Sequence, residues 1–129
     1  MGQTRAEAAL DGEWRIATTD LWDRAALDLV EPAFIRFDDE GLGAFGMIAL
    51  TGNLHCYYSE RDGRPLVEFT WEGDDDGDAR CGRGWASVHA DGTLRGRLFI
   101  HLGDDSGFVA ERATKARVRG ASRRRTRMR

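Results

Sequence analysis

The sequence predicts a mainly β protein: an antiparallel meander of about eight strands closed into a small barrel or half-barrel, with one short helix after the first strand. Three observations lead to this fold class. Apolar and polar residues alternate along most of the chain after residue 33, as they do in strands with one buried face. Glycine-containing turns separate these segments at short intervals. Closure of the meander would leave few exposed strand edges.

Size and composition limit the classes of protein to which this chain can belong. A chain of 129 residues with 41% hydrophobic and 32% charged residues is typical of one globular domain. We expect a flexible leader over residues 1–10, a barrel-like domain over 11–111 and a basic, mobile tail over 112–129. No apolar run is long enough to span a bilayer, and the first ten residues lack the apolar core of a secretory signal. Two cysteines are too few for a disulfide framework, so we expect a cytoplasmic protein.

The helix is expected over residues 20–30, directly after the first strand. Leu21, Ala25 and Leu29 recur every fourth residue, which is the spacing of one face of an amphipathic helix. Pro32 prevents the helix from continuing.

The strands are expected wherever the apolar residues recur with period two. Their ranges are 13–18, 33–38, 44–50, 53–59, 66–72, 83–89, 94–101 and 107–111. Asp62-Gly63 and Asp91-Gly92 are the clearest hairpin turns, because both dipeptides supply the positive φ that tight turns require. We also expect a turn at Gly52-Asn53 and a longer acidic loop over 73–78.

Sorting the expected strands by face separates a core from a polar surface. One face collects enough apolar side chains for a core: Trp14, Ile16, Ile35, Phe37, Cys56, Tyr58, Val67, Phe69, Trp71, Val88, Leu94, Leu98, Ile100 and Phe108. The opposite face is rich in ionisable and aromatic groups. Its candidate ligand-binding residues are Glu68, Glu72, Trp85, His89, Arg95, Arg97 and His101.

A G-x-W motif at residues 12–14 opens the first strand, and a helical stretch over 21–29 follows it. This pattern resembles the start of the calycin barrels, that is, the lipocalins and fatty-acid-binding proteins. The resemblance covers residues 11–31 by motif and the rest by strand count. It implies that Trp14 plugs the closed end of a barrel while the helix covers an opening. Residues 108–112 lack the Arg-x-Tyr pair with which fatty-acid-binding proteins hold a carboxylate, so the resemblance assigns no ligand residue.

The polar face supports two interpretations. Glu68 and Glu72 share a face of one strand, Arg95 and Arg97 share a face two strands later, and His89 lies between them. Two carboxylates facing two guanidinium groups can organise a polar ligand or perform acid–base chemistry. A solvent-facing lattice of cross-strand ion pairs explains the same residues. The sequence leaves both open, and it carries no catalytic triad, phosphate loop or metal motif, so we expect no cofactor and no metal.

Charge is distributed unevenly along the chain. Residues 1–111 hold all 22 acidic residues and 10 basic ones, a balance of −12, whereas residues 112–129 hold nine basic residues and no acidic one. The tail can contact nucleic acid phosphates, an anionic surface or the acidic body itself. An acidic body repels nucleic acid, so a main role in nucleic-acid binding is not expected.

These observations favour a non-catalytic binding protein for a small molecule or a partner protein. Two alternatives stay open. One is an enzyme that acts on an anionic small substrate through the face formed by Glu68, His89, Arg95 and Arg97. The other is an acidic interaction protein whose basic tail contacts nucleic acid. A homodimer also stays open, because the exposed Trp85 suits a dimer interface as well as a pocket. Residues 82–110 resemble small bacterial proteins of uncharacterised activity and imply no function.

Overall fold

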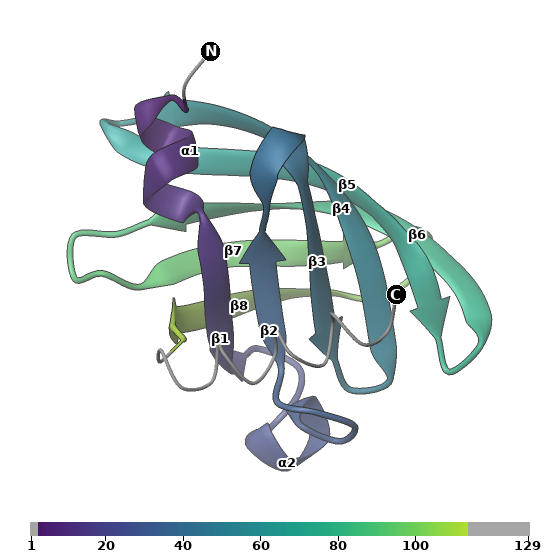
Figure 1. Ribbon diagram of the computed structural model, residues 1–129. Helices are drawn as coiled ribbons and strands as arrows, with labels where there is room; N and C mark the ends of the chain where they lie inside the picture. The colour runs from purple at the N-terminus through teal and green to yellow at the C-terminus, as the bar shows by residue number, and fades with distance from the viewer. Residues whose placement is uncertain (1–2, 114–129) are drawn as a thin grey trace, which may run out of the picture.

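The structure, a computed structural model that describes residues 3–113, is a closed barrel in which eight antiparallel strands follow one another in chain order (Figure 1). Its elements are α1 (Arg5–Leu10), β1 (Gly12–Thr19), α2 (Arg24–Leu27), β2 (Phe34–Phe37), the 3-10 turn η1 (Asp39–Gly41), β3 (Leu42–Met47), β4 (Leu50–Arg61), β5 (Arg64–Asp75), β6 (Asp78–Val88), β7 (Leu94–Ile100) and β8 (Asp105–Arg112). The predicted fold class is confirmed. All of the basic tail beyond residue 113 lies outside the described residues.

The barrel closes where the last strand pairs with the first. Antiparallel pairing of β1 with β8 runs from Trp14 opposite Arg112 to Thr19 opposite Phe108, with one irregularity between Ile16 and Thr18. No helix among residues 3–113 is long and apolar enough to cross a membrane.

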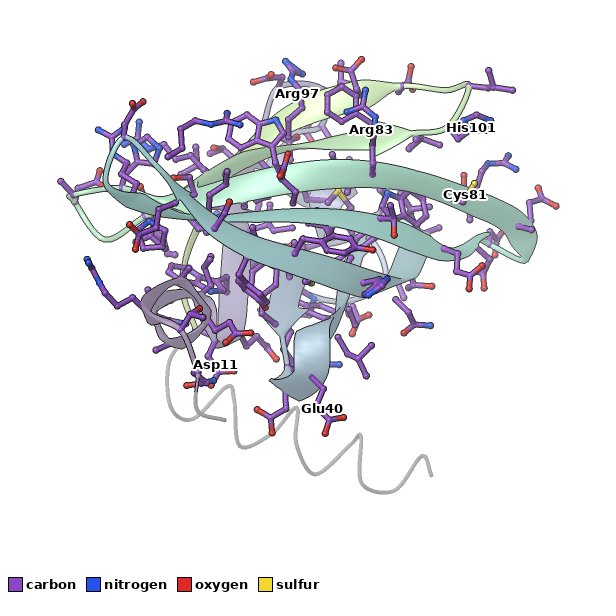
Figure 2. All side chains as sticks on the ribbon, turned by 90° about the horizontal axis from the view of Figure 1, so that it is seen from above. Asp11, Glu40, Cys81, Arg83, Arg97 and His101 are labelled. Atoms are coloured by element: carbon purple, nitrogen blue, oxygen red, sulfur yellow. The ribbon has the colours of Figure 1, made fainter. Side chains whose placement is uncertain are left out.

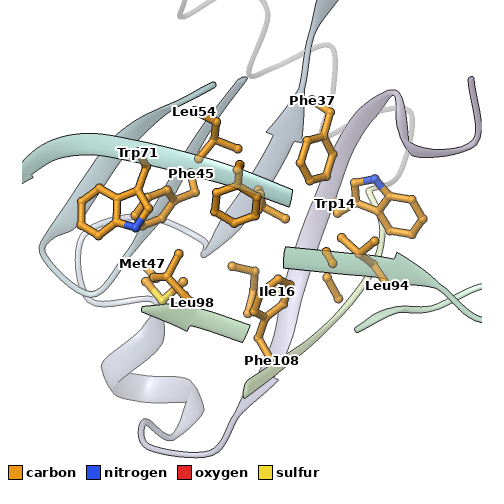
Figure 3. Packing of buried hydrophobic residues seen from close by; sticks show 14 of the residues in the cluster. Trp14, Ile16, Phe37, Phe45, Met47, Leu54, Trp71, Leu94, Leu98 and Phe108 are labelled. Atoms are coloured by element: carbon orange, nitrogen blue, oxygen red, sulfur yellow. The ribbon is translucent and has the colours of Figure 1, made fainter. Parts of the chain in front are cut away.

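Apolar side chains fill the interior of the barrel. Buried and exposed residues alternate strictly from Leu50 to Tyr57 in β4, which is the period-two pattern that the sequence predicts. Trp14, Phe37 and Phe45 are among the largest fully buried side chains, and Figure 3 shows side chains from different strands meeting in the interior. Phe45 and Trp71 pack edge to face with ring centroids 5.0 Å apart. Full burial of each such side chain contributes about 1.5–3 kcal/mol.

One cluster of contacts joins both ends of the described chain to the barrel. Trp14 is 1% exposed, and its indole Nε1 donates a hydrogen bond to the Leu10 carbonyl at 3.0 Å. The Arg112 guanidinium lies over the Trp14 ring, 4.0 Å from the centroid, and donates hydrogen bonds to the carbonyls of Ala9 at 2.7 Å and Asp11 at 2.6 Å. Arg112, which we expected in the tail, therefore ends β8 and ties it to β1 and α1.

Helix α1 lies in the segment that we expected to be a flexible leader. A capping box starts it: the Thr4 hydroxyl accepts from the Glu7 N–H at 3.1 Å, and the Glu7 carboxylate accepts from the Thr4 N–H at 2.8 Å. Ala6 and Leu10 are buried, so the helix packs its apolar side against the barrel end. Figure 1 shows α1 and α2 at opposite ends of the barrel.

The helix after β1 is much shorter than the predicted range 20–30. The Thr19 hydroxyl accepts from the Trp22 N–H at 2.9 Å and donates to the Trp22 carbonyl at 2.8 Å, which holds a turn before the helix. Asp23 caps the helix, and Leu27 is buried. Leu29, which we expected on the buried face, is 67% exposed. The fourfold spacing was therefore a misleading signal, because local side-chain hydrogen bonds to the backbone compete with helix formation here.

Two turns differ from the prediction. Gly52 lies inside β4 and not in a turn. Glycine is needed there because a Cβ would come 2.5 Å from Phe45 Cε1 and 2.8 Å from Trp71 Cε3. The chain turns instead at Ile48, with a φ of 52° that β-branched residues seldom adopt; its N–H donates to the Leu27 carbonyl at 2.8 Å. The acidic loop expected over 73–78 is a tight hairpin turn at residues 76–77, so β5 and β6 are longer than predicted.

We predict that Arg112→Gln lowers the free energy of unfolding by about 1–3 kcal/mol, because it removes a stacked cation and two charge-assisted hydrogen bonds. Urea unfolding followed by tryptophan fluorescence measures the change. Arg61→Gln is the matched control, since Arg61 is an exposed β4 residue, and it should change the free energy by about 0.5 kcal/mol or less. Equal effects of the two substitutions would contradict the role of Arg112.

Candidate functional site

A groove of about 850 Å³ opens on the outer face of the barrel across β3 to β7, and a second groove of about 880 Å³ adjoins it. Together they form what we call the outer groove. It is lined by two cross-strand rows of outward side chains. The first row is Leu42, His55, Thr70, Arg83 and Phe99, in the order in which the strands pair.

The second row runs parallel to the first and is displaced from it by two residues on each strand. It consists of Asn53, Glu72 and Cys81, which pair in that order. His101 extends the row, because its backbone N–H donates to the Cys81 carbonyl at 2.8 Å. Leu102, 93% exposed in the turn after β7, lines the end of the outer groove.

The floor of the outer groove lies between the two rows, where the residues of each strand point into the barrel. Trp71 and Gly82 pair with each other there, and Trp71 is buried in the core. A Cβ at Gly82 would collide with the Phe99 carbonyl oxygen and would come 2.8 Å from Trp71 Nε1. That same indole Nε1 donates a hydrogen bond to the Phe99 carbonyl at 3.2 Å. Glycine at this position therefore lets the Trp71 ring pack closely against β6 and β7 from inside the barrel.

Arg83 and Phe99 contact each other in the outer groove. The Arg83 guanidinium lies over the Phe99 ring, 4.1 Å from the centroid, which fixes the direction of an otherwise flexible side chain. Within residues 3–113 the guanidinium forms no ion pair. In Figure 2, Arg83, Arg97 and His101 lie on one side of the molecule, away from Asp11 and Glu40.

Other side chains of the outer groove supply mixed polarity. Glu72 is exposed and, in the described part of the chain, forms no ion pair. His55 contacts Tyr57, with ring centroids 4.8 Å apart and 3.4 Å between Nδ1 and the phenol oxygen. Thr70 pairs with Arg83 and presents a hydroxyl beside it. The site thus offers a cation, a carboxylate, imidazole and hydroxyl groups, and an aromatic ring.

The structure divides the seven candidate residues among three places. Glu72 and His101 line the outer groove. Glu68, Trp85 and Arg97 form one cross-strand row beside it. The remaining two candidates, His89 and Arg95, lie at the turn between β6 and β7.

The backbones of these candidates are spread over several strands of the outer face. Trp85 separates Glu68 from Arg97, so their backbones are two strand spacings apart, about 10 Å. Glu68 and Glu72 lie four residues apart on β5, which places their backbones about 13 Å apart.

Both candidate arginines are engaged by aspartates. Arg97 pairs with Asp105 at 2.9 Å and with Asp20 at 3.5 Å. Arg95 pairs with Asp91 at 2.9 Å. Hydrogen bonds from the Thr93 side chain and backbone, joined by the Arg95 guanidinium, lower the pKa of Asp91 to about 2. These pairs hold the strand ends and turns, and they offset much of the charge of both guanidinium groups.

His89 lies at the turn after β6, near the charges of Arg64, Arg95 and Asp91. Its backbone N–H donates to the Thr93 carbonyl at 2.9 Å. Burial, together with the charges of Arg64 and Arg95, lowers its pKa, so the ring is neutral at pH 7. The backbone of His101 bonds to Cys81, which lies eight residues before His89 along the chain, a distance of about 26 Å in an extended strand, so the two imidazoles do not act together.

Sequence reasoning did not select Arg83, Phe99 or Cys81 as site residues. The missing signal was the turn at residues 76–77. Once that turn is placed, each residue of β5 pairs with the residue of β6 that lies equally far from the turn. This pairing sets Cys81 opposite Glu72 and Arg83 opposite Thr70.

Within residues 3–113 no group of three or more His, Cys, Asp or Glu side chains is placed to hold a metal ion. Asp105, near His101 in sequence, is held by Arg97 at 2.9 Å.

Comparison with models of known protein families and with curated proteins finds no match for this chain. The function is therefore argued from the chemistry of the outer groove.

The two cysteines differ in a way that tests the placement of the outer groove. Cys81 is exposed, whereas Cys56 is buried, and burial raises the pKa of its thiol to about 11. We predict that Ellman's reagent at pH 8 reacts rapidly with one thiol of the native protein and with the second only after denaturation. Cys81→Ser should abolish the rapid phase. Rapid reaction of both thiols, or of Cys56 alone, would contradict the structure.

Proposed function

We propose that this protein is a non-catalytic binding protein built on a calycin-like barrel, and that it holds its ligand in the outer groove instead of inside the barrel. The observation that carries the proposal is the contrast between the two sides of the sheet. Bulky apolar side chains, with Trp14, Phe37 and Phe45 fully buried among them, occupy the interior. The outer face carries the grooves.

The size and lining of the outer groove suit a small ligand. Small-molecule sites have volumes of about 300–1,000 Å³ and combine apolar walls with a few placed polar groups. The first part of the outer groove, of about 850 Å³, lies within that range. Here Phe99, Leu42 and Leu102 supply apolar surface, and Arg83 and Glu72 supply charge.

The separation of Glu68, His89, Arg95 and Arg97 favours binding over the enzyme alternative. General acid–base catalysis needs the acting groups within hydrogen-bond reach of one substrate. Trp85 of β6 lies between Glu68 and Arg97, and both arginines already pair with aspartates. The exposed Tyr57 beside the outer groove suits a protein partner, which the experiment below distinguishes from a small molecule.

Native mass spectrometry of the full chain, incubated with a metabolite extract and then desalted, tests the proposal. We expect a small added mass that is lost on denaturation. Thr70→Trp should abolish it, because Thr70 lies in the middle of the outer groove. Thr51→Trp is the matched control, since Thr51 is an exposed β4 threonine outside the outer groove, and it should retain the added mass.

Retention of the added mass by Thr70→Trp, or no added mass on any form, would overturn the assignment of the outer groove to a small ligand. Incubation with a protein extract is the second arm. An added mass of protein size that Thr70→Trp removes would replace the small molecule by a protein partner at the same groove.

A further inference from the structure

Arg83 differs from Arg95 and Arg97, which lie near it on the outer face. Arg80, which lines the second part of the outer groove, also forms no ion pair among residues 3–113, and its guanidinium donates to the Ala79 carbonyl at 3.0 Å. Arg95 and Arg97 each have an aspartate at 2.9 Å, so their charge is neutralised within the fold. Among residues 3–113, Arg83 has no such partner. Its contact with Phe99 orients the guanidinium but leaves its net charge and its N–H donors available.

The neighbours of Arg83 suit an anion with an apolar body. Thr70, directly opposite in the strand pairing, can donate a hydroxyl hydrogen bond to the same oxygen atoms. His55 follows Thr70 in the row and can supply a further donor. Phe99 and the exposed Leu102 provide apolar surface on the other side.

Glu72 is the carboxylate of the outer groove, and it limits where an anion can bind. It lies in the second row, paired with Cys81, and no ion pair joins it to Arg83 within the described residues. An anion is therefore favoured on the first row, at Arg83, and disfavoured on the second row.

We propose that the ligand of the outer groove is a small organic anion, whose carboxylate or phosphate group binds the Arg83 guanidinium while its apolar part packs on Phe99 and Leu102. Guanidinium groups bind carboxylates and phosphates through two parallel hydrogen bonds, and such paired bonds require a fixed orientation of the group. The contact with Phe99 gives the Arg83 guanidinium that orientation. This inference rests on the proposed function, because it names the ligand class of the same site.

The test is a titration of the ¹⁵N-labelled full chain with four probes that share one ring: benzoate, phenyl phosphate, benzyl alcohol and benzylamine. We expect benzoate, phenyl phosphate or both to shift the backbone amide signals of Thr70, Arg83 and Phe99, with an affinity at least about tenfold above that of benzyl alcohol. The comparison of benzoate with phenyl phosphate separates the carboxylate from the phosphate.

Arg83→Gln should lower the affinity for the anionic probes about ten- to hundredfold and leave that for benzyl alcohol unchanged. Arg95→Gln, which removes an arginine outside the outer groove, should change neither affinity. If Arg83→Gln does not fold, Arg83→Lys serves instead, because it keeps the charge and loses the paired donors; it should weaken anion binding severalfold.

The outcomes separate this inference from the proposed function. Benzyl alcohol or benzylamine binding the outer groove as tightly as the anions would overturn the inference and leave a binding groove in place. Anion binding that Arg83→Gln does not weaken would overturn the assignment to Arg83. No shift with any probe would also overturn the inference, and the mass measurement on Thr70→Trp would then decide the proposed function on its own.

Discussion

The contact of Arg112 with Trp14 is the interaction on which the rest of the structure depends. It joins the last strand to the first, and through the carbonyl of Ala9 it also holds α1 over one end of the barrel. An antiparallel meander of eight strands leaves two edges, and these edges are satisfied only when β1 and β8 meet. Stacking a guanidinium on a buried indole places a charge at the rim of the core without burying it, because the guanidinium bonds to carbonyl oxygens that helix and strand ends leave unpaired. The G-x-W motif and a single arginine from the far end of the domain thus supply the closure together.

Closure determines where a ligand can bind. A small barrel whose inward positions carry Trp14, Phe45 and Trp71 has its interior filled by side chains, so the sheet offers ligands its outer face. That face carries the outer groove, whose floor lies between two rows of outward side chains. The charged residues beside this groove include two kinds of arginine. Those that pair with aspartates hold turns and strand ends, and Arg83, oriented by an aromatic ring, retains its charge. This division supports the outer groove as the binding site and argues against a catalytic role for the paired arginines.

Much of the fold and little of the site could be predicted from the sequence. Period-two alternation identifies both the strands and the side that faces inward, since it depends only on the geometry of the strand, and it correctly placed residues such as Ile35 and Phe69 in the core. Glycine was ambiguous: Gly52 indicated a turn but serves contact with two aromatic rings. The helix after β1 was overestimated because hydrogen bonds of Thr19 to the backbone decide the local conformation. The site was harder to predict, because it depends on which residues lie opposite one another on different strands. An error of a few residues in the turn between β5 and β6 hid the pairing of Thr70 with Arg83.

Native-state hydrogen exchange of the Trp14 indole N–H and of the amides that join β1 to β8 tests the central claim most directly. If Arg112 and Trp14 close the barrel as part of one cooperative unit, these protons exchange only through global unfolding. Their opening free energy then equals that of the amides between β4 and β5, and it falls in Arg112→Gln. Exchange of the β1–β8 amides through a local opening, at a free energy clearly below that of global unfolding and unaffected by Arg112→Gln, would contradict the account.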